Sequence, residues 1–272
     1  MKTFIRLSFI LVTFALYGCI DFSMKLTVNK DGSGTLEESI LMNKEIIDMI
    51  SGMAMAFGED TVASEKFSLY DVEKIKQEAA ERGSGVEYVS SEQIILPDKE
   101  GYNVVYKFSD VNQLSIKQNP MELTSMNTLS GQMPMEQSLG ENLKFNFAPG
   151  STAELEIIFT EQGIEDEELS EEEDTMDTNE SSFEEMKAFM KGFRISLGVE
   201  VNGNIVETNA AYVDDSKITL FDIDFDQLLS NEEKFNELKN LKPGDFSTIK
   251  DVMKNIPGFK IETNTPVIIK FK

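Results

Sequence analysis

Hydrophobic and polar residues alternate along much of the chain, and this period of two predicts β-strands joined as hairpins. The clearest hairpin covers Met24 to Asn43, where Lys30-Asp31-Gly32-Ser33-Gly34 forms the turn because Asp-Gly tolerates positive φ values. Asn202-Gly203 is a second turn signal of this kind and predicts a hairpin between residues 195–201 and 205–213. Further strands are expected around turns at 97–101 and 149–150, and over residues 217–225 and 265–271.

Other stretches repeat their apolar residues with the spacing of an amphipathic helix. One covers Lys44 to Phe57, and a second runs from about Tyr70 to Arg82, with Ser68 and Asp71 in front of it as a capping pattern. A shorter helix is expected over residues 183–194. Together these elements predict an α+β fold with a mostly antiparallel sheet built from hairpins and amphipathic helices on one face.

The composition changes abruptly at residues 161–185, where 13 of 25 residues are acidic. Such a segment buries too little apolar surface to offset its ordering entropy, so it predicts an acidic disordered insertion or linker. It separates an α+β region over residues 19–160 from a second over residues 186–272, which we expect to complete the sheet. We favour an insertion because neither region alone closes an obvious sheet.

The N-terminus has the features of an export signal. Lys2 and Arg6 precede an apolar run that is too short to span a bilayer, which is typical of a secretory signal peptide over residues 1–18. Leu16-Tyr17-Gly18-Cys19 then resembles the lipobox of bacterial lipoproteins, although Tyr17 stands where a small residue is usual. The resemblance implies that Cys19, the only cysteine, becomes the mature N-terminus and carries fatty acyl chains such as palmitate.

The charge of the mature chain limits the classes of partner that it can bind. Removal of residues 1–18 leaves 23 basic and 49 acidic residues, a net charge of −26. A body of this charge is repelled by nucleic acid and by anionic lipid headgroups, so we expect no nucleic-acid partner and a membrane affinity supplied by the lipid on Cys19. We expect a lipid-anchored protein of the cell envelope that faces the periplasm.

The residue types argue against an enzyme. The chain has no histidine, and its one cysteine is assigned to the lipid, so Ser-His-Asp and Cys-His catalysis are excluded. Gly-rich phosphate loops are absent as well, and no cofactor is expected. A carboxylate-based envelope hydrolase stays as an alternative because a pair of acids cannot be recognised in a sequence.

One acidic constellation resembles a calcium loop. Asp222, Asp224, Asp226 and Glu233 match positions 1, 3, 5 and 12 of an EF-hand, but Gln227 stands where the loop requires Gly. The element before it reads as a strand, so we interpret the four acids as a polar strand face and keep calcium as the alternative. No other metal site is expected, since the methionines that might hold Cu(I) are irregularly spaced.

Two strand-turn stretches resemble the LppM-type domain of bacterial envelope lipoproteins. The first is Cys19-Ile20-Asp21 with the strand from Lys25 to Asn29 and its turn, and the second runs from Val201 to Ala210 with Lys217-Ile218-Thr219. The resemblance covers about a fifth of the chain and implies a lipid-associated α+β envelope module. It supplies no catalytic residue. Where that family has a membrane helix after the domain, we expect a final strand instead.

The expected function is therefore a non-catalytic interaction or structural module that binds an unknown envelope protein. The alternative is a carrier of a lipid-like hydrophobic ligand, which would need a cavity lined by Met53, Phe57, Phe189 and Phe193.

Overall fold

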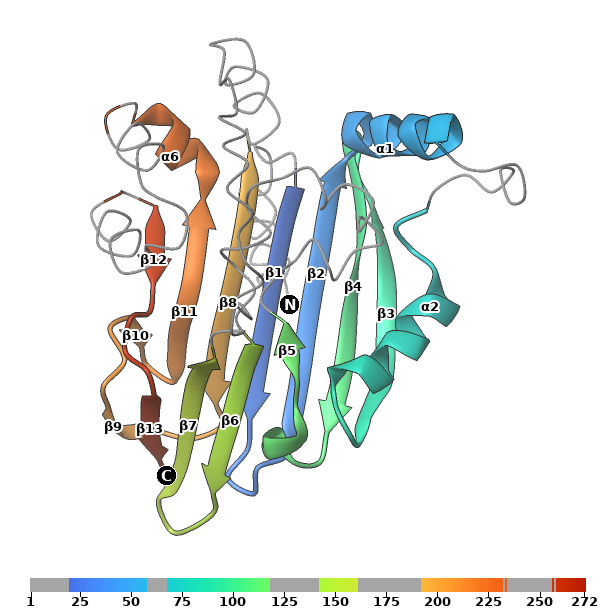
Figure 1. Ribbon diagram of the computed structural model, residues 1–272. Helices are drawn as coiled ribbons and strands as arrows, with labels where there is room; N and C mark the ends of the chain where they lie inside the picture. The colour runs from blue at the N-terminus through green and yellow to red at the C-terminus, as the bar shows by residue number, and fades with distance from the viewer. Residues whose placement is uncertain are drawn as a thin grey trace, which may run out of the picture.

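Two β-sheets form the protein in the computed structural model, which describes residues 20–57, 68–117, 142–160, 192–231, 233, 256 and 258–272 (Figure 1). The strands of the larger sheet are β1 (Ile20–Val28), β2 (Gly34–Asn43), β3 (Val86–Ile95), β4 (Lys99–Phe108), β8 (Phe193–Val201), β10 (Val213–Asp214), β11 (Lys217–Asp224) and β12 (Phe259–Ile261). Those of the smaller sheet are β5 (Ile116–Lys117), β6 (Asn142–Ala148), β7 (Ala153–Thr160), β9 (Ile205–Thr208) and β13 (Val267–Phe271).

The larger sheet has the strand order β10-β11-β8-β1-β2-β4-β3, with β12 also paired to β11, and the smaller has the order β5-β6-β7-β13-β9. The predicted hairpins β1–β2, β3–β4 and β6–β7 are present and antiparallel. In the described residues, only the pairing of β1 with β8 is parallel, so the larger sheet is mixed. Both sheets contain strands from before residue 161 and after residue 191, and the two regions therefore share them.

The hairpin predicted across Asn202-Gly203 is wrong. Strand β8 lies between β1 and β11 in the larger sheet, whereas β9 pairs with β13 in the smaller one. The turn therefore carries the chain from one sheet to the other. A Cβ at Gly203 would lie 2.5 Å from the carbonyl oxygen of Lys272, which explains why glycine is needed where the turn meets the last strand.

The core lies on one face of the larger sheet. Alternate residues of β1, from Ile20 to Val28, are buried in one hydrophobic cluster with residues of the smaller sheet such as Leu155 and Ile269. Figure 1 shows the smaller sheet in front of the lower half of the larger sheet. Among the described residues, the core face is therefore covered largely by a second sheet, and the predicted layer of amphipathic helices on one face is not confirmed.

The described helices lie at the borders of the larger sheet (Figure 1). They are α1 (Lys44–Phe57), α2 (Val72–Glu78), which continues as the 3-10 turn η1 (Ala79–Arg82), the 3-10 turn η2 (Val111–Gln113) and α6 (Phe225–Ser230). The bounds of α1 agree with the prediction, whereas α2 begins at Val72 and its N-cap is Asp71, so the predicted capping box of Ser68 and Asp71 is not formed. The predicted helix over 183–194 is wrong at its end, since Phe193 and Arg194 open β8. The rest of that helix lies outside the described residues, and so does the acidic segment.

None of the helices in the described part of the chain is both long and apolar enough to cross a membrane.

Candidate functional site

The face of the larger sheet opposite the core is polar and half-buried. On β1 the residues that alternate with the core are Asp21, Ser23, Lys25 and Thr27. On β8 they are Arg194, Ser196, Gly198 and Glu200, which stand beside those of β1 because the parallel register pairs Asp21 with Arg194 and Lys25 with Gly198. Since successive side chains of a strand point to opposite faces, this set forms one continuous polar surface.

A broad open hollow of about 960 Å³ lies over this surface. Strands β3, β4, β2, β1, β8 and β11 all contribute to its lining. Its side chains are mainly hydroxyls, amides and charged groups, among them Ser23, Ser39, Asn103, Ser196 and Thr219. The hollow is built on central strands of the sheet, so its polar groups are held by a rigid scaffold.

The charged groups at the middle of the hollow are paired with one another. Lys25 Nζ lies 3.0 Å from Glu37 Oε1 on β2 and 4.0 Å from Glu200 Oε2 on β8. Lys25 and Glu37 are direct cross-strand partners, the arrangement in which opposite charges attract best in a sheet. Their side chains stay 44% and 45% exposed, so they are open to solvent or to a partner.

A second pair stands nearer the beginning of β1. Arg194 donates to Asp222 on β11 through Nε at 3.0 Å and Nη2 at 3.1 Å, a bidentate contact. The hydrogen bonds that Arg194 donates to Asp222, and then the charges of the nearby acids, raise the pKa of Arg194. Burial raises the pKa of the neighbouring Asp21 carboxyl, although the Arg194 charge acts in the opposite direction.

Another ion pair lies on the core face. Glu38 follows Glu37 on β2 but points inward, where it is 2% exposed, and its Oε2 accepts a hydrogen bond of 2.8 Å from Arg82 Nη2. Arg82 belongs to η1 and lies 6.0 Å from the ring centroid of Tyr106. Burial raises the pKa of Glu38, and the Arg82 charge offsets this only in part. Since the pair is enclosed, it has a structural role.

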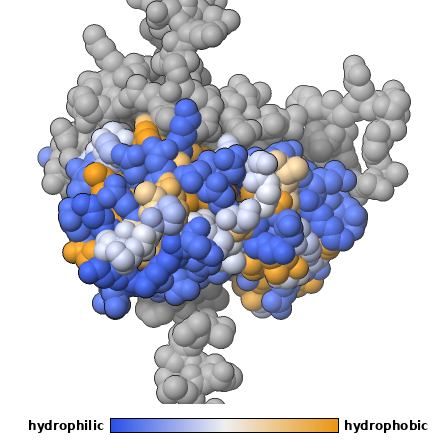
Figure 2. All heavy atoms as spheres, turned by 90° about the horizontal axis from the view of Figure 1, so that it is seen from below, coloured by the Kyte–Doolittle hydropathy of each residue, from blue (hydrophilic) through white to orange (hydrophobic). Residues whose placement is uncertain are grey.

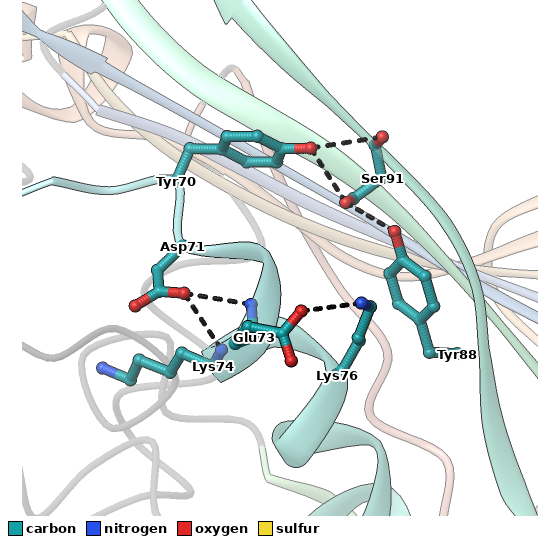
Figure 3. Close-up of polar contacts among 7 residues, drawn as sticks. All are labelled: Tyr70, Asp71, Glu73, Lys74, Lys76, Tyr88 and Ser91. Carbon is teal, nitrogen blue, oxygen red and sulfur yellow. Dashed lines mark hydrogen bonds and ion pairs between the residues drawn. The ribbon is translucent and has the colours of Figure 1, made fainter.

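The helix that supplies Arg82 is attached to the edge of the sheet by a small polar cluster (Figure 3). Tyr70 donates to the Ser91 carbonyl of β3 at 3.4 Å, and the Tyr88 hydroxyl lies 2.8 Å from Ser91 Oγ. Asp71 Oδ1 caps the start of α2 by accepting from the amides of Glu73 and Lys74. These contacts place α2 and η1 beside β3, and so bring Arg82 to Glu38.

The acids of the predicted calcium loop are used in other contacts. Asp222 binds Arg194, Asp224 Oδ1 accepts from the Asp226 amide, and Asp226 Oδ1 accepts from the Gly192 amide. Glu233 is described only as a helical residue beyond α6. Within the described residues, no three acidic, cysteine or histidine side chains are grouped so that they could hold a metal ion.

The other predicted site residues fall mostly outside the description. Cys19 and Phe189 are not among the described residues, and for Met53 and Phe57 only the helical backbone is described. Phe193 is buried, with its ring 5.2 Å from that of Phe225, in the core and not in the hollow.

Sequence reasoning missed the hollow itself. The alternation of residues 193–201 and 20–28 indicated a polar face on each strand. The two polar faces form one surface because β1 pairs with β8 in parallel. This pairing joins distant residues, so no local sequence pattern predicts it.

Comparison with known proteins gives little. No family model matches the chain, and no curated protein matches it. Among solved structures, it is similar to the NMR structure of the folded domain of LppM from Mycobacterium tuberculosis, at 11% identity and a TM-score of 0.32. The likeness covers 94% of this chain and 91% of that one.

Proposed function

We propose that this protein is a non-catalytic lipoprotein of the cell envelope, anchored through Cys19, that binds a polar segment of another envelope protein in the hollow of its larger sheet. The observation that carries the proposal is the hollow itself, which has a volume of about 960 Å³ and is lined mostly by polar residues on central strands of the sheet. Preorganised polar groups on strands give a binding site whose geometry needs little ordering when the partner arrives.

The chemistry of the lining favours a polar partner over a hydrophobic ligand. A carrier of lipid-like molecules needs an apolar cavity. On the core face of the larger sheet, Leu26 of β1 and Leu155 of β7 are instead both 0% exposed, so these residues line no open cavity. The hollow on the other face presents hydroxyls and paired charges, which hydrogen-bond to polar groups.

The same lining favours binding over carboxylate catalysis. Glycoside hydrolysis needs one carboxyl that gives a proton and another that is ionised. In the hollow, Glu37 and Glu200 instead share one ammonium, that of Lys25, at 3.0 and 4.0 Å. Paired charges of this kind suit the binding of polar groups.

Site-specific photo-crosslinking in the producing cells tests the proposal. A photoreactive amino acid replaces Thr219, which lines the hollow, and in the matched control it replaces Val206, which is 52% exposed on β9 of the other sheet. We expect a discrete adduct of protein mass from position 219 and none of that mass from position 206. The absence of an adduct at 219, or equal adducts at both positions, would contradict the proposal.

A further inference from the structure

The position at which the lipid is attached fixes which end of the fold meets the membrane. Cys19 immediately precedes Ile20, the first residue of β1, so no linker separates the anchor from the sheet. Ile20 is paired with Met42 near the end of β2, and α1 begins two residues later at Lys44. From strand spacing and chain geometry, the start of α1 lies within roughly 17 Å of residue 19.

Helix α1 is held at this end of the sheet. The Lys44 amide donates to the Asp98 carbonyl at 3.0 Å, and Lys44 Nζ donates to the Leu96 carbonyl at 2.6 Å, both in the turn between β3 and β4. Asn43 Oδ1 caps the helix by accepting from the Glu45 amide, and Ile47 is buried in the core. Figure 1 shows α1 lying across the ends of the strands at this end.

Two of the exposed large apolar side chains lie at the same end. Met49 of α1 is 43% exposed, and Ile95, the last residue of β3, is 66% exposed. The register places Ile95 in one row with the anchor, because Ile95 pairs with Glu100, Glu100 with Met42, and Met42 with Ile20. Residues 49–57 of α1 also contain no charged side chain.

The opposite end of the sheet has a different surface. Figure 2 views it along the strands and shows a mainly hydrophilic surface with smaller apolar patches. Next to the attachment point, α1 contains the exposed Met49 and an uncharged stretch of sequence over residues 49–57.

We infer that α1, together with Ile95, lies in the interfacial layer of the membrane to which Cys19 is attached. This rests on the lipid anchor in the proposed function. An amphipathic helix with few basic residues binds a bilayer through its apolar surface, and tethering beside the anchor raises its effective concentration there. The mature charge of −26 opposes anionic lipid, so the membrane it fits is one with zwitterionic headgroups.

The single cysteine makes a direct test simple. In the lipidated mature protein the Cys19 sulfur is blocked, so Met49→Cys and Ile95→Cys each introduce one free thiol for an environment-sensitive fluorophore. The labelled protein is reconstituted into phosphatidylcholine vesicles whose acyl chains are brominated. The matched control is Val213→Cys, which is 44% exposed but pairs with Ile218, near the opposite end of the sheet.

We expect the probes at 49 and 95 to shift to the blue and lose most of their emission to the bromine quencher, with neither change at 213. Emission at 49 and 95 that matches emission at 213 overturns the inference. Intact mass, measured first, separates the two claims. A chain without the acyl mass on Cys19 removes the anchor and this inference together, whereas an acylated chain with unquenched probes removes only the inference.

Discussion

Glu37 and Glu38 are neighbours on β2, but they lie on opposite faces of the larger sheet and have different tasks. Glu37 is 45% exposed in the hollow and shares Lys25 with Glu200, whereas Glu38 is enclosed with Arg82 on the core face. The interaction is of the same chemical type on both faces. Burial decides how much stability depends on each pair. A charge inside the protein must keep its partner, whereas a charge at the surface can exchange its partner for another.

The largest loss of stability is expected when Arg82 is replaced. Arg82→Met leaves the Glu38 carboxylate buried without its partner, and we expect the free energy of unfolding to fall by about 3–5 kcal/mol. Urea unfolding of the mature protein, followed by circular dichroism, measures this. The double variant Glu38→Leu with Arg82→Met removes both charges and should recover most of the loss. If Arg82→Met unfolds at the urea concentration of the unchanged protein, the pair has no structural role.

Gly34 on the core face and Gly198 on the polar face differ in the space around them. A Cβ at Gly34 would lie 1.9 Å from the Thr27 carbonyl oxygen and 2.6 Å from the Phe108 ring, so Gly34→Ala should cost about 1–3 kcal/mol through overpacking. Gly198 lies in the hollow, where a Cβ would meet only the Ile218 oxygen at 3.6 Å. Gly198→Ala should therefore change stability by less than about 0.5 kcal/mol. Thermal melting of both variants tests this, and equal losses would argue against an open hollow.

The buried carboxyl should also make stability depend on pH, with a smaller effect than the loss of Arg82. Burial raises the pKa of Glu38 in the folded state above its usual value, so the folded state binds this proton more tightly than the unfolded chain does. This contribution to stability is complete below the usual pKa of Glu and is lost as the pH rises through the folded pKa. We expect the free energy of unfolding to fall less steeply over this range in Glu38→Gln. Parallel curves for the two proteins would show that Glu38 does not titrate in this way.

The smallest effect is expected on the polar face. Lys25→Gln removes the ammonium between Glu37 and Glu200, and since these side chains are partly exposed, the loss should be at most about 1 kcal/mol. Chemical denaturation in low and in moderate salt measures it, and salt should reduce the difference further. A loss as large as that of Arg82→Met would mean that the two faces do not differ as described.

Local patterns predicted most of the elements. The Asp31-Gly32 turn, the alternation on both sides of it and the apolar stripe of α1 identified the first hairpin and helix, because these signals depend on residues close together in sequence. Asn202-Gly203 was misinterpreted because the dipeptide specifies a turn, but not which strand the chain pairs with afterwards.

The two faces could not be predicted because their charged groups come from distant residues. Glu38 lies at a core-facing position of β2, and its burial is explained only by the docking of η1, which brings Arg82 to it. In the sequence, Arg82 was interpreted only as the last residue of a predicted helix. In the hollow, Lys25 and Glu200 meet through the pairing of β1 with β8, across more than half of the chain.

Crosslinking from position 219 should be lost when a side chain fills the hollow. Gly198→Trp places an indole in the hollow from a position where the backbone tolerates a side chain, and Gly198→Ala is the matched control. We expect the adduct from position 219 to persist with alanine and to disappear with tryptophan, while both proteins stay folded and membrane-bound. An adduct of unchanged yield in the tryptophan variant would contradict the claim that this face binds the partner.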